Sequence, residues 1–408
     1  MAKPAQSRTA RFEAKRELIL NAAARLFNAR GVRATTLADV AGEVSLATNS
    51  VTYYYKRKED LASACFYRSI STMREIIERA EDEATAEARI RRFVISYGEM
   101  IQDLARTRNQ EFVTFKEVRA MTGADRERLF QMYGEMFRAA RRLFGTETGL
   151  SRRALNARTH LLLTAAVWTR NWITTYDITD YPRACATIAD ILIGGLGAGG
   201  ARWHVMAGDP PALFAEEAGE ESSNELFLRA ATRLVNEQGY VGASVDKISA
   251  ELKVTKGAFY HHIDNKDDLI TSCFRRTLDV VRSLQSVAQA RNDTGWARLC
   301  DCARLFIRYH LSPNGPLIRF TWWVSLPEPM RSEMEAEIRR VTQRFCGFFV
   351  DGMVDGSVRV LDQTVAAHLL TGCLNASAEL QYWVTDVTQD EGPEIYIRPL
   401  FMGILSND

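Results

Sequence analysis

A chain of 408 residues is longer than one ordinary domain and suggests two or more. Its apolar content of 46% and charged content of 25% match globular domains with complete cores. The net charge of +1 excludes a chain that is basic overall, so any surface that holds nucleic acid must be local.

The N-terminus and the cysteines both favour a cytoplasmic location. Residues 1–17 are basic and lack the apolar segment of a secretory signal, and no stretch reaches the roughly 18 apolar residues that span a bilayer. Seven cysteines, an odd number without a Cys-x-x-Cys pair, fit a reducing compartment. Cys300 and Cys302 are too close together for a zinc knuckle. We expect no metal, no cofactor and no membrane partner.

An internal repeat dominates the sequence. The segment ELILNAAARLFNARG from Glu17 aligns with ELFLRAATRLVNEQG from Glu225, and Gly31 meets Gly239 at a displacement of 208 residues. Over residues 17–66 there are 15 identities in 50 positions without a gap. Such fixed self-similarity indicates a duplicated unit. Two later matches at the same displacement extend it over about 200 residues: Phe112 with Phe320, and His160 with His368.

The first copy begins with the pattern of a helix-turn-helix. A helical apolar repeat ends at Gly31, a typical C-cap. Thr36 and Asp39 have the spacing of a capping box and predict a short helix over 37–43, and a third helix is predicted over 48–54. Two short helices joined by a tight turn after a longer helix define the motif.

The second copy repeats this layout. Its first helix ends before Gly239, Ser244 caps a helix over 245–252, a further helix covers 255–262, and another starts near Lys266. Amphipathic helical patterns follow in both copies with almost no strand signal; examples are residues 126–143, 155–176 and 331–352.

These segments resemble the TetR/AcrR family of bacterial regulators. That family has a threonine-capped second helix, a short recognition helix, and then an aromatic residue and a lysine at fixed spacing. The second copy matches with VTKGAFYHHIDNKDDL from Val254, and the first reads LATNSVTYYYKRKEDL from Leu46. The first copy departs from the pattern at Thr52, where the family usually has tyrosine.

The resemblance implies an all-α fold of two TetR-like units. Each unit is a three-helix DNA-binding domain followed by a helical domain for ligand binding and dimerisation. The implied boundaries are 1–62 for the first helix-turn-helix domain, 63–196 for the first regulatory domain, 197–222 for a linker rich in Gly, Pro and Glu, 223–270 for the second helix-turn-helix domain and 271–408 for the second regulatory domain.

The candidate DNA contacts lie on the recognition helices and around them. The exposed face of a recognition helix needs small or hydrogen-bonding residues to read the major groove. A lysine that starts the next helix meets phosphate together with the helix N-terminus. Tyr55 is assigned to the core. The candidates are Arg8, Arg11, Lys15, Arg16, Thr36, Thr48, Asn49, Thr52, Tyr53 and Lys58 in the first copy, and Ser244, Thr255, Lys256, Tyr260, His261 and Lys266 in the second.

Charge distinguishes the two copies. Residues 1–61 contain 11 Lys and Arg against 6 Asp and Glu, a net charge of +5, whereas the matching residues 209–269 contain 6 against 12, a net charge of −6. Because neutralising phosphate supplies most non-specific affinity for DNA, we expect the first copy to be the stronger DNA reader.

The regulatory halves are expected to hold a small-molecule effector. Aromatic residues on their helices are candidates for a pocket, although helical aromatic residues are more often part of a core. The candidates are Phe112, Phe115, Trp168, Trp172 and Tyr176 in the first copy, and Phe320, Trp322, Trp323, Tyr382 and Trp383 in the second.

We therefore expect a transcriptional regulator that binds double-stranded operator DNA, and specifically a repressor released by an apolar or aromatic effector. The alternative is a regulator in which only the first helix-turn-helix binds DNA and the second copy serves assembly or protein interaction. An enzyme is not expected, because no nucleophile–base motif or phosphate-binding glycine loop is present. The linker of about 26 residues is long enough for an intrachain pseudo-dimer, which we favour over a homodimer of chains.

Overall fold

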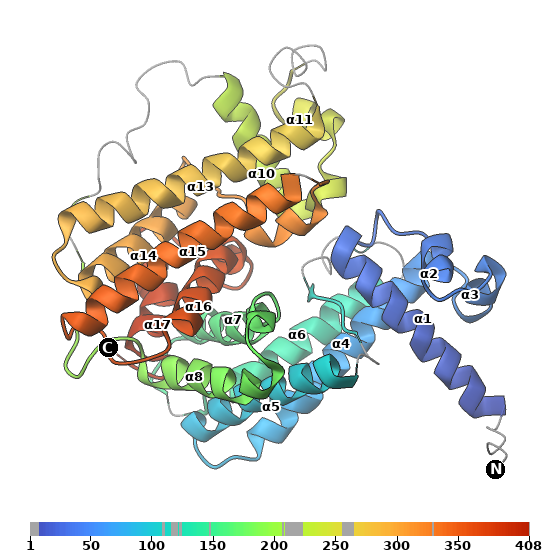
Figure 1. The fold of residues 1–408 in the computed structure, drawn as a ribbon, viewed down its shortest axis with the longest axis horizontal. Coiled ribbons are helices and arrows are strands. Elements are labelled where there is room, and N and C mark those ends of the chain that lie inside the picture. The colour runs from blue at the N-terminus through green and yellow to red at the C-terminus, as the bar shows by residue number, and fades with distance from the viewer. Residues whose placement is uncertain are drawn as a thin grey trace.

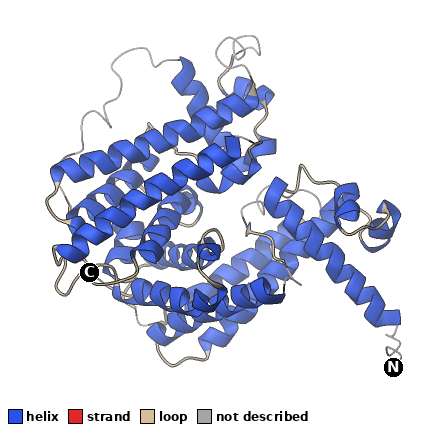
Figure 2. Ribbon diagram, viewed as in Figure 1, coloured by secondary structure: helices blue, strands red, loops and turns tan. Residues whose placement is uncertain are grey.

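The structure is a computed structural model and describes residues 8–107, 111–115, 121, 125–146, 148–205, 208, 223–254, 265–328 and 330–407. Within these ranges the regular structure is helical, with one isolated β-bridge between Gly197 and Val358 (Figure 2). The prediction of an all-α fold is confirmed. None of the helices in the described ranges is long and apolar enough to span a bilayer.

The first copy starts with a helix-turn-helix and continues into a helical domain. The bounds of α2 and α3 are those expected from the capping residues and the apolar pattern. The helices are α1 (Arg8–Arg30), α2 (Leu37–Glu43), α3 (Thr48–Tyr54), α4 (Lys58–Glu81), α5 (Ala86–Thr107), α6 (Arg126–Arg142), α7 (Arg152–Thr169), the 3₁₀ turns η2 (Ile173–Thr175) and η3 (Ile178–Asp180), and α8 (Tyr181–Gly194).

The second copy repeats this order 208 residues further along the chain. Thus α4 begins at Lys58 and α13 at Lys266, and the displacement holds without a gap to the C-terminal helices. The elements are α10 (Ser223–Gly242), α11 (Val245–Glu251), α13 (Lys266–Arg291), α14 (Gly295–Leu311), η4 (Phe320–Ser325), α15 (Met330–Val354), α16 (Gln363–Ala376), η5 (Ser377–Tyr382), the π-helical turn η6 (Pro393–Ile397) and α17 (Arg398–Met402).

One helix is shorter than its sequence pattern suggested. The apolar pattern predicted a helix over 155–176, but α7 ends at Thr169 and 3₁₀ turns follow. The hydroxyl of Thr175 donates to the carbonyl of Trp172 at 2.8 Å, and the carboxylate of Asp177 accepts the amide of Thr179 at 2.9 Å. These local bonds offer the backbone an alternative to a continued helix.

Local caps explain where the short helices of the first copy begin. The hydroxyl of Thr36 accepts the amide of Asp39 at 3.1 Å, and the Asp39 carboxylate accepts the amide of Thr36 at 2.8 Å. Gly31 takes φ +83°, which favours glycine and ends α1. Val51 and Tyr55 are buried and fix α3 to the core, as predicted for Tyr55.

Each helix-turn-helix is tied to the following long helix by the same contacts in both copies. In each copy, a cysteine thiol of the long helix lies near a backbone carbonyl of the first helix, and an arginine of the long helix forms an ion pair with a glutamate of the first helix. The contacts are Cys65 with Leu20 (3.6 Å) and Arg68 with Glu17 (2.9 Å) in the first copy, and Cys273 with Leu228 (3.4 Å) and Arg276 with Glu225 (2.6 Å) in the second.

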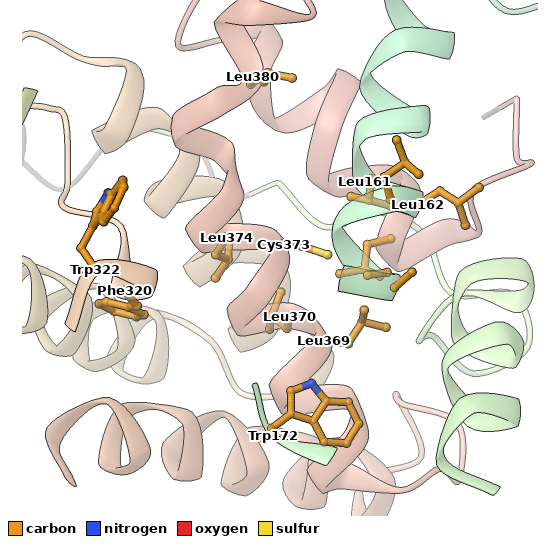
Figure 3. Packing of buried hydrophobic residues seen from close by; sticks show 14 of the residues in the cluster. Leu161, Leu162, Trp172, Phe320, Trp322, Leu369, Leu370, Cys373, Leu374 and Leu380 are labelled. Carbon is orange, nitrogen blue, oxygen red and sulfur yellow. The ribbon is translucent and has the colours of Figure 1, made fainter. Parts of the chain in front are cut away.

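The two copies pack against each other through their last helices. α7 packs on α16 and on η6, while α8 packs on α16 and α17 (Figure 1). Because α16 is the counterpart of α7, and η6 with α17 is the counterpart of α8, both copies contribute equivalent elements to the contact. Leu161 and Leu162 of α7 lie beside Leu369 and Cys373 of α16 in the apolar centre of this contact (Figure 3). The chain thus forms within itself the reciprocal kind of interface that a twofold dimer forms between subunits.

Two equivalent glycines lie where the backbones of the two copies meet. Gly195 has φ +72°, and a Cβ there would lie 2.3 Å from the carbonyl oxygen of Phe401. Gly403 has φ +98°, and a Cβ there would lie 2.5 Å from the carbonyl oxygen of Ile193, which is the residue equivalent to Phe401. The amide of Leu196 donates to the Phe401 carbonyl at 2.9 Å. Only glycine fits on either side of this contact.

The first part of the segment predicted as a linker is packed against the second copy. Trp203 contacts the ring of Phe401 and donates its indole N–H to Glu394 at 2.9 Å. The indole of Trp296 donates to the carbonyl of Arg202 at 2.8 Å. Residues 206, 207 and 209–222 lie outside the described ranges.

Candidate DNA-binding and effector sites

The recognition helix of the first copy, α3, presents polar side chains at its surface. Thr48 and Asn49 are exposed, and Tyr53 has 75% of its surface exposed. Thr52 is half-buried, and its hydroxyl donates to the carbonyl of Thr48 at 2.9 Å. The buried face of α3 carries Val51, so the helix is held from one side while the other remains available.

The N-terminal part of α1 extends past the core and contacts α3 through aromatic side chains. The ring of Phe12 lies 4.7 Å from that of Tyr54 and 6.2 Å from that of Tyr53. The basic candidates Arg8, Arg11, Lys15 and Arg16 all belong to this helix (Figure 1). Arg11 and Lys15 are exposed on it.

Arg16 and Arg8 differ from these two exposed residues. The guanidinium of Arg16 is engaged by the hydroxyl of Tyr55 at 3.2 Å and by the carboxylate of Glu13 at 3.5 Å. The side chain of Arg8 lies outside the described part of the structure, although its backbone begins α1.

The two candidate phosphate-binding lysines have different surroundings. Lys58 donates to the carbonyl of Arg33 at 3.0 Å in a partly exposed position at the start of α4. The ammonium of Lys266 lies 4.5 Å from the ring centre of Tyr240, and burial lowers its pKa. The hydroxyl of Tyr240 donates to Asp267. The second lysine is therefore already held by a ring and flanked by a carboxylate.

Of the remaining candidates of the second copy, Ser244 lies within the described residues. Thr36 and its counterpart Ser244 both cap their short helices, and the Ser244 hydroxyl accepts the amide of Lys247 at 3.4 Å. The predicted recognition residues Thr255, Lys256, Tyr260 and His261 lie outside the described residues.

A cavity of about 920 Å³ lies between the two copies. Its walls come from the end of α1, from α4, α6 and α7 of the first copy, and from η4, α15, α16 and η5 of the second. Of the ten predicted pocket residues, four line it: Phe115, Trp168, Tyr382 and Trp383.

The other predicted pocket residues do not line this cavity. Phe112, Trp172, Phe320 and Trp322 are buried in the core. The hydroxyl of Tyr176 lies 3.2 Å from the carboxylate of Asp362 in the contact between the copies. The side chain of Trp323 lies outside the described part of the structure.

The cavity contains charged groups that the aromatic pattern did not indicate. Arg319 pairs with Glu379 at 2.6 Å, and Nε2 of His160 lies 3.6 Å from the same carboxylate. The ring of Trp383 stacks on that of Phe137 at 3.7 Å between centres. Arg319, Glu379 and Trp383 belong to the second copy and the other two to the first. No local sequence signal unites groups so far apart in the chain.

The cavity also reaches the first helix-turn-helix. Asn28, near the end of α1, lines the cavity. Its side-chain Nδ2 donates to the backbone carbonyl of Phe112 at 2.8 Å, and its side-chain Oδ1 accepts the backbone amide of Thr114 at 2.9 Å. Arg170 lines the cavity, donates to the Phe112 carbonyl at 3.0 Å and pairs with Glu111. The loop 111–115 thus joins the cavity wall to the DNA-reading domain.

The helix-turn-helix of the first copy, and the repetition of the helices around it in the second copy, are the architecture of a helical DNA-binding regulator. The family model described as bacterial regulatory proteins of the tetR family matches residues 19–65 and again 227–273. Both matched segments are of the TetR family's type, and they are 208 residues apart, which is the displacement of the internal repeat.

Individual relatives match one part of the chain each. The Transposon Tn10 TetC protein of Escherichia coli is 26% identical over 157 residues, which is 37% of this chain and 76% of that protein. The HTH-type transcriptional regulator HbdR of Aromatoleum sp. (strain CIB) is 34% identical over 59 residues, covering 14% of this chain and 26% of HbdR.

Two solved structures each match less than half of this chain over nearly their own full length. AibR in complex with isovaleryl coenzyme A and operator DNA has a TM-score of 0.38 at 23% identity, over 44% of this chain and 98% of that one. The TetR family transcriptional regulator PfmR from Thermus thermophilus has a TM-score of 0.33 at 17% identity, over 42% and 95% of the two chains.

Proposed function

We propose that this protein is a cytoplasmic transcriptional repressor that holds its operator mainly through the first helix-turn-helix. An apolar or aromatic effector that enters the cavity between the copies releases it from DNA. The observation that carries this proposal is the exposed polar face of α3 within a segment of net charge +5.

The second helix-turn-helix contributes less to DNA binding. Its matching segment has a net charge of −6, and Lys266 is half-buried against the ring of Tyr240. A lysine that must leave an aromatic ring before it meets phosphate gains less from that contact. The operator is accordingly asymmetric, with one strong half-site.

The effector acts through the loop that Asn28 and Arg170 hold. A ligand that moves either side chain loosens the attachment of α1 to loop 111–115 and so changes the orientation of the first DNA-reading domain. We assign residues 1–62 and 223–270 to DNA reading and residues 63–196 and 271–408 to regulation, with 197–222 as the connection.

The proposal is tested with an operator selected in vitro from random duplexes. Lys58→Ala is expected to weaken binding about tenfold and to reduce the dependence on salt by about one released counterion. Lys266→Ala is the matched control at the equivalent position, and a loss below about threefold is expected because its segment has a net charge of −6 and its ammonium lies against the ring of Tyr240. Equal losses would contradict the asymmetry.

Footprinting of the same complex distinguishes the two forms of the proposal. Protection of two half-sites means that both copies touch DNA, whereas protection of one means that the second copy serves assembly. A reporter gene placed behind the operator distinguishes repression from activation. If the protein without effector raises transcription above the level measured without the protein, it is not a repressor.

The packing of α7 and α8 on α16 and α17 also leads us to propose that one chain is the functional dimer. Light scattering is then expected to give a mass near 46 kDa. Twice this mass would instead indicate a conventional homodimer of chains.

A further inference from the structure

The DNA-reading domains of the two copies contact each other. A Cβ added at Gly242 would lie 2.6 Å from Nη1 of Arg33 and 3.4 Å from its Cζ, so the guanidinium of Arg33 lies directly on the backbone at the end of α10. Gly242 is the counterpart of Ala34, the residue that follows Arg33. The contact therefore joins the segment after Gly31 in the first domain to the equivalent segment after Gly239 in the second.

Each side of this contact is fixed within its own domain. The ammonium of Lys58 donates to the backbone carbonyl of Arg33 at 3.0 Å. The ammonium of Lys247 donates in the same way to the backbone carbonyl of Gly242 at 3.1 Å. Because both segments are held by a lysine of their own domain, a contact between them aligns the domains themselves.

A second element lies between the two domains. The 3₁₀ turn η4 packs on α10 and α15 of its own copy and on α1 of the first copy. The side-chain Oδ1 of Asn236 in α10 accepts the backbone amide of Arg319 at 3.0 Å, and its Nδ2 donates to the carbonyl of Leu317 at 2.9 Å. The segment that leads into η4 is thus fixed to the second DNA-reading domain. The first domain therefore contacts the second copy both at Arg33 and at η4.

The opposite charges of the two domains favour their contact. Residues 1–61 have a net charge of +5, and the matching residues 209–269 have a net charge of −6. A homodimer of first copies would bring two domains of the same positive charge together, and at physiological ionic strength such repulsion acts over about 8 Å. In the tandem chain the acidic second domain attracts the basic first domain instead. The negative charge that weakens the second domain as a DNA reader makes it a suitable support for the first.

We propose that Arg33 is a positioning residue. Its contact with Gly242, together with η4, holds the two DNA-reading domains at one separation and so fixes the spacing between the strong and the weak half-site of the operator. Half-sites read by two linked helix-turn-helix domains must match the separation of the domains, commonly about one helical turn or roughly 10 base pairs. The inference rests on the proposed function, because it takes both domains to lie on one operator.

Pulsed electron paramagnetic resonance measures the separation of the domains without DNA. Gly42→Cys and Ala250→Cys place nitroxide labels at equivalent, exposed positions of α2 and α11, and the seven native thiols are buried and stay unlabelled. We expect one narrow distance distribution when Arg33 is present and a distribution at least twice as wide for Arg33→Ala. A broad distribution with Arg33 present, or one that Arg33→Ala leaves unchanged, would overturn the inference.

Operators with altered spacing test the consequence for DNA binding. Inserting five base pairs between the half-sites turns the second one by about half a helical turn, and wild-type affinity is expected to fall about fivefold. Arg33→Ala is expected to lose less than about twofold on the same insertion, because its second domain can follow the half-site. Equal sensitivity of the two proteins to the insertion would overturn the inference.

A matched control and the salt dependence exclude a direct phosphate contact as the cause. Arg79→Ala removes the same charge from an exposed position of α4 outside the DNA-reading domain, and it is expected to keep the wild-type preference for spacing. If Arg33 instead met phosphate, Arg33→Ala would weaken binding equally at every spacing and would reduce the salt dependence by about one released counterion. That result would overturn the positioning role.

The two measurements separate this inference from the proposed function. If the distance distribution is broad while footprinting still shows a protected half-site, the inference is wrong and the DNA-binding role stands. If the distribution is narrow and depends on Arg33 but no operator is selected from random duplexes, the contact between the domains stands, and the DNA-binding role fails together with the fixed spacing.

Discussion

Replacing Gly195 with alanine tests whether the two copies approach as closely in solution as in the structure. Gly195 has φ +72° and ψ −167°, a region that other residues enter at a cost of about 1–3 kcal/mol. The added methyl carbon would also lie 2.3 Å from the carbonyl oxygen of Phe401, and overpacking of this kind costs about 1–3 kcal/mol more. The free energy of unfolding is therefore expected to fall by about 2–6 kcal/mol.

The assay is urea unfolding followed by circular dichroism, with Gly200→Ala as the matched control. Gly200 has φ +81° but no atom within 4 Å of an added Cβ, so only its backbone strain of about 1–2 kcal/mol is expected. Gly403→Ala should resemble Gly195→Ala because its Cβ would meet the carbonyl oxygen of Ile193 in the same way. If Gly195→Ala costs no more than Gly200→Ala, the close contact between the copies is absent and the reasoning fails.

Three further predictions concern caps, histidines and thiols. Thr36→Ala should cost about 1 kcal/mol of stability, and an NMR titration should show the pKa of Asp39, which hydrogen bonds from Thr36 hold below its ordinary value of 3.8, rise toward that value; an unchanged pKa would contradict this. Burial lowers the pKa of His310 and His368 to about 4. The unfolded chain therefore takes up protons below about pH 6.5 that the folded chain does not, and stability should fall as the pH drops from there to about 4. His368→Phe should flatten this fall in urea titrations, and an identical pH profile would argue against it. All seven thiols are buried and their pKa values raised by burial, so none should react with Ellman's reagent until urea unfolds the chain.

The DNA-reading part was predictable because its determinants are local in sequence. The capping box of Thr36 and Asp39 and the positive φ of Gly31 depend on a few neighbouring residues, and both appear as predicted. The displacement of 208 residues found in the sequence also separates equivalent helices of the structure, since α4 begins at Lys58 and α13 at Lys266. Patterns of this kind need no knowledge of tertiary contacts.

The cavity could not be predicted in the same way. Aromatic composition pointed equally to Trp168, which lines the cavity, and to Trp172, which is buried and stacks on His368 at 5.0 Å. Which of the two meets a cavity depends on α16, about 200 residues away in the chain. The charged pair of Arg319 and Glu379 gave no signal either, because the two residues are far apart in the sequence and charged side chains usually lie at the surface.

Duplication explains why some residues in the contact between the copies are identical at equivalent positions, whereas others differ. At Gly195 and Gly403 the backbones approach from both sides, so each copy needs glycine and neither position tolerates change. At Trp168 and Gly372 the requirement is complementary, because a large side chain on one side needs a small one on the other. In a homodimer one gene would have to satisfy both roles with the same residue. Joining the copies in one chain removes that constraint and also holds the halves at high effective concentration, so the interface can lose symmetry without losing association. Under the function proposed above, an asymmetric operator and an asymmetric cavity between the copies follow from the same event.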